Sequence, residues 1–323
     1  MSGALEVLDG GRFAIVVDRG RFGFRGEGVA TGGPLDAVGF AVANLLAGND
    51  ANAAALEIAL GGLKIRFHGF TRFALAGAAC AADLDGVRAD VWGSYEARAG
   101  ATLTLRRPRA SARTYLAVAG GVGVPRVLNS RDTNVAASFG GYEGRALRAG
   151  DRVPLESEVR RSFPPGARPR CKPPQWDFAA DAFAPPELAV RFLAGGEFAL
   201  LGSDARDALW SNAYAIAPQS NRMGARLTGS TAIAFAHGGF PSHAVFPGVV
   251  QLPPSGEPIV LLADAQTTGG YPKLGCAIEA DLWKIAQLPI GSRLHFVPCS
   301  IEDAAEARRE VASYLERVEA SLP

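Results

Sequence analysis

The chain is short of the residues and patterns that mark metal, redox, membrane and nucleic-acid proteins. It has four cysteines and four histidines in 323 residues, and no two stand at the spacing that zinc and redox motifs use. No apolar run approaches the roughly 20 residues that a bilayer requires, and the first residues lack the pattern of a secretory signal. A net charge of +1 gives no basic excess for nucleic acid. We therefore expect a cytoplasmic chain without a metal, a membrane segment or a nucleic-acid partner, whose cysteines are reduced thiols, three of them in strands.

Several catalytic motifs are missing as well. There is no Gly-x-Ser-x-Gly elbow and no phosphate-binding loop of the Walker type, which argues against a serine hydrolase and against an independent ATPase. The glycine-rich stretches 120–123 and 140–144 lack the long helix that follows the glycines of a dinucleotide-binding fold, and tight turns explain them better. His237 and His243 have no partner at metal-ligand spacing.

The length of the chain and a proline-rich segment near its middle predict two domains. With 48% hydrophobic residues, a chain of this size can fill two cores. Residues 156–187 contain seven prolines, a density that neither a helix nor a central strand tolerates. We expect an N-terminal domain over 1–155, a proline-rich linker over 156–187 that is exposed to proteases, and a C-terminal domain over 188–323.

Short, often alternating apolar runs separated by Gly, Asp or Pro predict a mainly β protein with few helices. One short buried helix is predicted over 36–46 with Asp36 as its N-cap, and a second over 278–286. Residues 301–322 have the spacing of an amphipathic helix, with Ser300 as its cap and Asp303 three residues on.

Residues 259–281, IVLLADAQTTGGYPKLGCAIEAD, are the most informative stretch. An apolar strand, 259–262, runs directly into polar and glycine residues, and a glycine pair lets backbone N–H groups approach a ligand closely. Taken alone, the same letters also fit an ordinary Gly-Gly hairpin turn.

Seven ordered blocks carry a resemblance to a known family. They are DRGRFGFRGEGVATGGPLD (18–36), ANLLAGN (43–49), LEIALGGLKIRF (56–67), RTYLAVAGGVGVPRVLNSRDT (113–133), FGGYEGRALRAGDRVPL (139–155), SNRMGARLTG (220–229) and PGVVQLPPSGEPIVLLADAQTTGGYPK (247–273). With these blocks the chain resembles the biotin-dependent carboxyltransferase-like family, also called KipA-like, allophanate hydrolase subunit 2 or the 5-oxoprolinase C subunit. The resemblance implies two cyclophilin-like β-barrels.

Three functions follow from the resemblance. The main expectation is the C subunit of an ATP-dependent 5-oxoprolinase, which opens the lactam of 5-oxoproline to glutamate together with a KipI-like B subunit and a separate A subunit. The alternative is the carboxyltransferase part of a urea or amide carboxylase that takes carboxybiotin from a partner. A third is a non-catalytic regulatory partner of a KipI-like protein. The chain has only Met1 and Met223 and so no Met-Lys-Met biotin-attachment sequence, and we expect it to bind no cofactor alone.

Three residues are the candidates for catalysis. Arg222, in a polar turn before a strand, can grip a carboxylate with two N–H groups. Asp264 follows the buried strand directly; burial would raise its pKa and make it a base, or a neighbour such as Lys273 would hold it ionised. The plainer alternatives are a surface arginine and a carboxylate that caps its own turn. Lys273 is a candidate partner for an anionic group, although most lysines are merely solvated.

We expect the three to converge at one rim of a barrel. The candidate substrate-binding residues around them are Asn221, Gln251, Gln266, Thr267, Thr268, Gly269, Gly270 and Tyr271. Gln251 interrupts an apolar strand, and such an amide also fits a purely structural role with a partner inside the protein.

Overall fold

The computed structural model describes residues 3–108, 111–157, 160–174, 187–235 and 240–323. The chain divides into two compact units. Unit 1 comprises Met1–Arg21, Gly32–Gln175 and Ser313–Pro323, and unit 2 comprises Phe22–Thr31 and Trp176–Ala312. These bounds differ from the predicted ones: 22–31 belongs to unit 2, 313–323 belongs to unit 1, and the predicted linker 156–187 is divided between unit 1, up to Gln175, and unit 2, from Trp176. Residues 158–159 and 175–186 of the predicted linker lie outside the described residues.

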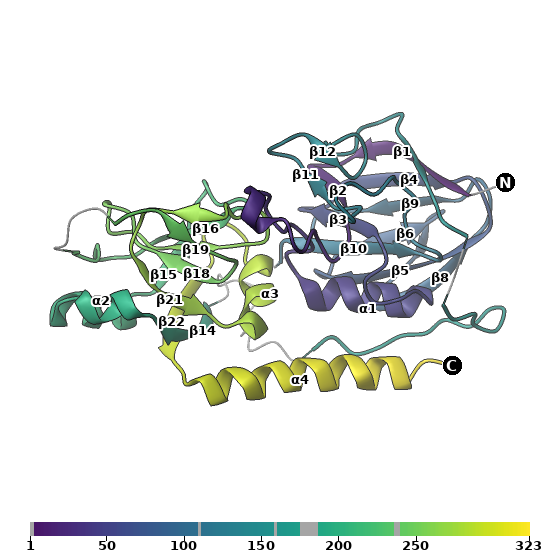
Figure 1. Ribbon diagram of the computed structural model, residues 1–323. Coiled ribbons are helices and arrows are strands. Elements are labelled where there is room, and N and C mark those ends of the chain that lie inside the picture. The colour runs from purple at the N-terminus through teal and green to yellow at the C-terminus, as the bar shows by residue number, and fades with distance from the viewer. Residues whose placement is uncertain (1–2, 109–110, 158–159, 175–186, 236–239) are drawn as a thin grey trace. The chain divides into compact units, whose positions relative to one another are not determined.

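Unit 1 contains two antiparallel sheets and a small ribbon (Figure 1). The first sheet has the order β13-β1-β4-β9-β6-β7, with β1 Ala4–Gly10, β4 Leu63–Phe67, β6 Ala82–Leu84, β7 Val87–Arg88, β9 Thr102–Leu105 and β13 Arg152–Pro154. The second has the order β2-β3-β10-β5-β8, with β2 Phe13–Val17, β3 Ala55–Ala59, β5 Thr71–Gly77, β8 Gly93–Ala97 and β10 Arg113–Val118. The ribbon pairs β11 Thr133–Asn134 with β12 Phe139–Gly140.

Burial patterns explain how these sheets pack. In β4 and β9 buried residues alternate with more exposed ones, as expected for a sheet with one face on a core. Strands β2 and β10 are buried almost throughout, because helix α1 (Ala37–Ala47) covers the second face of their sheet and packs against β5 and β10 (Figure 1). The Asp36 side chain accepts a hydrogen bond from the Gly39 N–H at 2.8 Å, which confirms the predicted N-cap.

Unit 2 is built on a closed seven-stranded barrel with the order β14-β21-β18-β19-β16-β15-β22. The strands are β14 Glu187–Ala194, β15 Tyr214–Ile216, β16 Gly224–Thr228, β18 Val249–Gln251, β19 Ile259–Leu261, β21 Lys273–Ala277 and β22 Arg293–Pro298. Parallel pairing of β14 with β22 closes the barrel. A separate ribbon pairs β17 His243–Ala244 with β20 Thr268–Gly269. The buried ring of Phe296 packs against the buried rings of Phe192 and Tyr214.

The remaining helices of unit 2 are short, apart from the last. They are the 3-10 helices η1 Arg25–Glu27 and η2 Gly196–Leu200, and the α-helices α2 Ser203–Ser211 and α3 Glu279–Gln287. Helix α4 (Ile301–Ala320) begins in unit 2, and its last turns belong to unit 1. Ser300 Oγ accepts the Asp303 N–H at 3.0 Å while Asp303 Oδ2 accepts the Ser300 N–H at 2.8 Å. This reciprocal pair confirms the predicted start of the helix.

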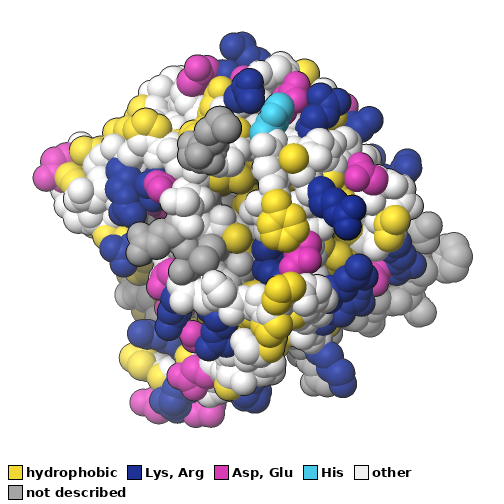
Figure 2. Space-filling model, turned by 90° about the vertical axis from the view of Figure 1, so that its right-hand side faces the viewer, with side chains coloured by type: hydrophobic (Ala, Val, Ile, Leu, Met, Phe, Trp, Pro, Cys, Tyr) yellow, Lys and Arg dark blue, Asp and Glu magenta, His cyan; other side chains and the backbone are white. Residues whose placement is uncertain are grey.

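The mainly β fold with few helices is confirmed, and the barrel of unit 2 is closed. In unit 1 the strands form two sheets that share one apolar core, and α1 covers the other face of the second sheet. All four cysteines are free thiols, but Cys276 alone lies in a strand, so the expectation of three was wrong. No described helix has the length and apolar character needed to cross a bilayer. On the face shown in Figure 2, basic, acidic and apolar side chains are interspersed, in keeping with the near-zero net charge.

Candidate functional site

Two neighbouring strands of unit 2 bring Arg222 and Asp264 together. Strand β16 pairs antiparallel with β19, with Gly224 opposite Leu261. The turn before β16 and the turn after β19 therefore lie at the same end of the barrel. Backbone bonds extend the ladder there, since the N–H of Asp264 donates to the carbonyl of Arg222 at 3.0 Å. The two side chains, both predicted as candidates for catalysis, are thus adjacent although they lie 42 residues apart in the sequence.

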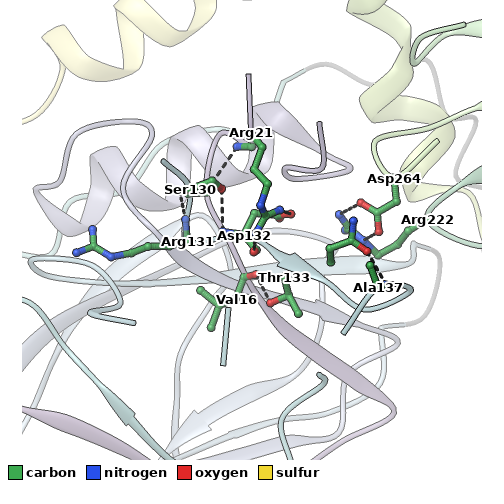
Figure 3. Close-up of polar contacts among 12 residues, drawn as sticks. Val16, Arg21, Ser130, Arg131, Asp132, Thr133, Ala137, Arg222 and Asp264 are labelled. Carbon is green, nitrogen blue, oxygen red and sulfur yellow. Dashed lines mark hydrogen bonds and ion pairs between the residues drawn. The ribbon is translucent and has the colours of Figure 1, made fainter. Parts of the chain in front are cut away.

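Arg222 grips the Asp264 carboxylate in two places (Figure 3). Its Nε donates to Oδ2 at 2.8 Å and its Nη2 donates to Oδ1 at 3.0 Å. The side chains are 9% and 11% exposed, so water screens the pair only weakly. Arg222, and not Lys273, is the cation that pairs with Asp264. One edge of the guanidinium is committed to this carboxylate.

Lys273 is the first residue of β21, opposite Gln251 of β18. It is 9% exposed, and its Nζ donates to the carbonyl of Gly269 at 2.7 Å. Burial lowers the pKa of Lys273, and the nearby Glu197 carboxylate partly opposes this shift. An amine in such a position binds an anionic group strongly and gives up a proton more easily than a solvated lysine does.

Gln251 is 2% exposed and lies beneath the polar stretch. Its Oε1 accepts a hydrogen bond from Gln266 Nε2 at 3.3 Å, while its Nε2 has no acceptor among the residues that the structure describes. Gly269 packs directly on this nitrogen, and a Cβ added at Gly269 would overlap it. The geometry thus favours the structural role of Gln251 as a support for the backbone above it.

The other predicted residues lie nearer the surface. Asn221 is exposed, and its Oδ1 accepts the Met223 N–H at 2.8 Å, so the amide shapes its own turn. Thr267 is half-buried, and its carbonyl accepts the Val245 N–H at 3.0 Å. Thr268 is exposed, Gly270 is half-buried, and Tyr271 is 46% exposed. These residues offer hydroxyl and aromatic surface to a ligand.

Two charged residues that contact the polar segment 264–273 were not predicted from the sequence. Glu197, in η2, accepts the backbone N–H of Lys273 and pairs with His243 Nε2 at 3.2 Å. Arg25, in η1, donates to the carbonyls of Val245 and Gln266. No sequence pattern points to Glu197. Arg25 lies in the first matched block, where the resemblance alone did not separate it from its neighbours.

Neither a metal-binding group nor a cavity marks the predicted site residues within the part of the chain that the structure describes. No group of three or more His, Cys, Asp or Glu in the described ranges is arranged to hold a metal ion. Two cavities of about 470 and 480 Å³ lie in unit 1, and none of the predicted site residues lines them. Arg222 and Asp264 lie where β16 begins and β19 ends, whereas Lys273 lies beside Gln251 and Ile259 at the opposite end of these strands, and residues 265–272 connect the two places.

Unit 1 contains a separate buried polar cluster (Figure 3). Arg21 and Asp132 are both fully buried, with Nη1 to Oδ2 at 3.1 Å. Asp18 accepts the Ser130 hydroxyl at 2.6 Å and the backbone N–H of Gly20 at 2.9 Å. These residues belong to the matched blocks 18–36 and 113–133, so part of the family pattern reflects the folding of unit 1.

The sequence matches the family described as carboxyltransferase domain, subdomain A and B, over residues 27–298. The chain belongs to this family. It is 42% identical over 316 residues to the 5-oxoprolinase C subunit of Escherichia coli strain K12, a match that covers 97% of each chain. It is 35% identical to the 5-oxoprolinase C subunit of Haemophilus influenzae, again over 97% of each chain.

The structure is also similar to part of a larger enzyme. The urea carboxylase of Kluyveromyces lactis superposes with a TM-score of 0.89 and 27% sequence identity. The match covers 99% of this chain but only 30% of that one. The recognition of the family from its seven blocks is confirmed.

Proposed function

We propose that this chain is the C subunit of an ATP-dependent 5-oxoprolinase, which opens the lactam of 5-oxoproline to glutamate. The single observation that carries the proposal is the 42% identity to the Escherichia coli C subunit along 97% of both chains. The matches to enzymes acting on urea are less similar and cover only a fraction of those longer chains.

The geometry of unit 2 suits an anionic amide substrate. Lys273 would bind the carboxylate of the substrate or a phosphoryl group. Because burial lowers its pKa, its ammonium group would also release a proton as the charge on the bound group changes. The paired Arg222 and Asp264 would orient the polar turn and present a carboxylate edge to the ring N–H. The exposed Thr268 and Tyr271 would contact the substrate from the rim.

The partners follow from the same proposal. A KipI-like B subunit and an A subunit would complete the enzyme, and the complex as a whole would use ATP. An enzyme that consumes ATP works where ATP is plentiful, so the proposal includes a cytoplasmic complex. We propose no cofactor bound by this chain alone.

The second candidate is carboxyl transfer from a partner's carboxybiotin to a urea-like nitrogen. The observation in its favour is the superposition on urea carboxylase at a TM-score of 0.89. Both reactions require a resonance-stabilised amide to be polarised beside an anionic group. A regulatory partner without catalysis is the third candidate, and the buried Lys273 amine, whose pKa burial lowers, speaks against it.

One reconstitution decides among the three. The chain is assayed alone and with the A and B subunits from its genomic neighbourhood, using 5-oxoproline and ATP and measuring glutamate. We expect no glutamate from the chain alone and ATP-dependent release from the complex. Equal turnover by the lone chain would contradict the multi-subunit proposal. A urea-dependent loss of the labelled carboxyl group from free carboxybiotin would favour carboxyl transfer. A complex that is inactive in both assays would favour a regulatory role.

A further inference from the structure

A short segment from the N-terminal part of the sequence belongs to unit 2. Phe22–Thr31 folds as a tight turn around η1, in which the N–H groups of Glu27 and Val29 both donate to the carbonyl of Phe24 at 3.2 Å. Gly28 ends the turn with a φ of 84°, in the left-handed region that favours glycine. The segment therefore has a defined shape of its own.

Arg25 carries the polar contacts of this segment. Its Nη2 donates to the carbonyls of Val245 and of Gln266, the second at 3.3 Å, and its Nη1 donates to Thr31 Oγ1 at 3.4 Å. The side chain is half-buried, and burial lowers its pKa. A charged donor removed partly from water strengthens its bonds to carbonyl oxygens.

The two carbonyls belong to opposite arms of the β17–β20 ribbon. Val245 follows β17, and Gln266 lies two residues before the start of β20. The arms are also joined by the Val245 N–H, which donates to the Thr267 carbonyl at 3.0 Å. Val245 and Ala265 anchor the base of the ribbon in a small apolar cluster with Val249 and Leu261. Arg25 thus ties both arms together at one place.

The ribbon leads directly into the candidate site. Asp264, which pairs with Arg222, lies two residues before Gln266, and the Gly269 carbonyl that receives Lys273 Nζ lies three residues after it. The Gln266 side chain also reaches the buried Gln251. If the carbonyl of Gln266 moved, the backbone between Asp264 and Gly269 would move with it.

We propose that Arg25 is a positioning residue of this site: its guanidinium joins the carbonyls of Val245 and Gln266 and so fixes the backbone that carries Asp264, Gln266 and Gly269. This inference rests on the proposed function only for the reaction that the site carries out. A planar fork is suited to this task because it directs donors along fixed lines, which an ammonium group does not.

The test is amide hydrogen exchange on the full chain, followed by kinetics of the reconstituted complex. Arg25→Ala should speed exchange in peptides covering 243–246 and 264–270 by about tenfold to hundredfold, as expected for losing charge-assisted bonds. Peptides from β14 and β22 should exchange as in the wild type. Arg25→Lys should restore protection only in part. Arg226→Ala, which removes an exposed arginine of the same unit, is the matched control and should leave both regions unchanged.

In the reconstituted 5-oxoprolinase, Arg25→Ala should lower kcat by about tenfold or more with a smaller change in KM, and Arg25→Lys should recover part of the loss. Unchanged exchange in the ribbon would overturn the inference. Faster exchange throughout unit 2 would also overturn it, since Arg25 would then support the whole barrel. If the wild-type complex has no activity, the proposed function fails while the exchange data still decide the role of Arg25; Arg25→Lys replaces Arg25→Ala if the latter does not fold.

Discussion

An arginine that holds a carboxylate with two parallel bonds fixes both position and orientation, whereas a lysine fixes only distance. Arg222 and Asp264 form such a pair with both side chains about nine-tenths buried. A buried carboxylate left without its cation is costly, so the pair contributes to stability as well as to the shape of the site. A single substitution at Arg222 mixes these two effects, and an experiment has to separate them.

The first prediction separates them with a pair of variants. Arg222→Ala should lower kcat/KM of the reconstituted enzyme about tenfold to hundredfold, which corresponds to losing about 1.5–3 kcal/mol. It should also lower the melting temperature, because Asp264 loses its partner. The double variant Arg222→Met with Asp264→Leu removes both charges and should regain melting temperature without regaining activity.

The control for that experiment is Arg226→Ala, which should match the wild type in both measurements. Arg222→Lys should rescue little activity, because a point charge does not reproduce the two-point grip. A double variant that recovers activity along with stability would show that the pair is purely structural.

The second prediction concerns the glycine pair. A Cβ at Gly269 would overlap the buried Gln251 Nε2, whereas the nearest atom to a Cβ at Gly270 is Ser242 Oγ at 3.2 Å. Gly269→Ala should therefore destabilise the chain by about 1–3 kcal/mol in urea unfolding, and Gly270→Ala by clearly less. In a Gln251→Ala background the cost of Gly269→Ala should largely disappear. An equal cost in both backgrounds would mean that the strain lies in the backbone.

Among the elements, those with local signals could be predicted from the sequence. The caps at Asp36 and Ser300 are short patterns whose hydrogen bonds close within three residues, and both are present. Strand 259–262 and the helix near 278–286 were found within one residue. The adjacency of Arg222 and Asp264 followed from two polar turns flanking strands of one barrel. Lys273 binds Gly269 instead of joining them, because the register of β21 against β18 is a long-range property.

Contacts between residues far apart in the sequence explain the features of the structure that the sequence did not predict. The burial of both faces of one unit 1 sheet depends on where α1 packs, and no local pattern contains that information. Glu197 reaches Lys273 across 76 residues, and Arg25 reaches Gln266 across 241. The fully buried pair of Arg21 and Asp132 spans 111 residues. Such contacts are set by topology, so residue type alone did not reveal them.

The third prediction is a pH dependence at the element scale. Asp281, fully buried in the first turn of α3, accepts from the Arg191 backbone at 2.9 Å, from Arg191 Nη2 at 2.7 Å and from Lys284 Nζ at 3.0 Å. Burial raises the pKa of Asp281, but the hydrogen bonds from Arg191 and the charge of Lys284 outweigh it, and the pKa lies below its ordinary value. The stabilisation is therefore fully present above about pH 4 and is lost as pH falls through the folded-state pKa.

Asp281→Asn should accordingly cost about 3 kcal/mol at neutral pH, because it leaves Arg191 and Lys284 without their anion. The difference in melting temperature between variant and wild type should shrink as pH falls below about 4. Asp207→Asn, an exposed position on α2, is the control and should show no such trend. A difference that stays constant down to the acid limit would contradict the assigned role of Asp281.

At the scale of the whole molecule, the order of the chain and the composition of the units do not coincide. Residues 22–31 belong to unit 2, where Arg25 is bonded, while Ser313–Pro323 belongs to unit 1. There Tyr314 donates to the Lys172 carbonyl at 2.8 Å and Val318 joins the apolar cluster around α1. Each half of the sequence thus supplies a segment to the unit formed mainly by the other half.

This exchange leads to the last prediction, on limited proteolysis. The first cleavage was predicted within 156–187, and the structure narrows it. The stretch 160–172 is tied to unit 1 by the Arg161 N–H to the Gly48 carbonyl at 2.9 Å and the Cys171 N–H to the Trp92 carbonyl at 3.1 Å. Trypsin should therefore spare the bonds after Arg161 and Arg170, and the first cleavage should fall elsewhere within 156–187.

The nicked chain should elute as one particle in native buffer and separate into two fragments only in denaturant, because each fragment retains a segment folded into the opposite unit. Removing the C-terminal segment that folds into unit 1 tests whether such segments hold the two fragments together. A chain truncated after residue 312 loses the contacts of Tyr314 and Val318, and once nicked it should come apart at a lower urea concentration than the full-length chain. Fragments of the full-length chain that separate without denaturant would show that the exchanged segments hold too weakly to join the units, and early cleavage inside 259–273 would contradict the division itself.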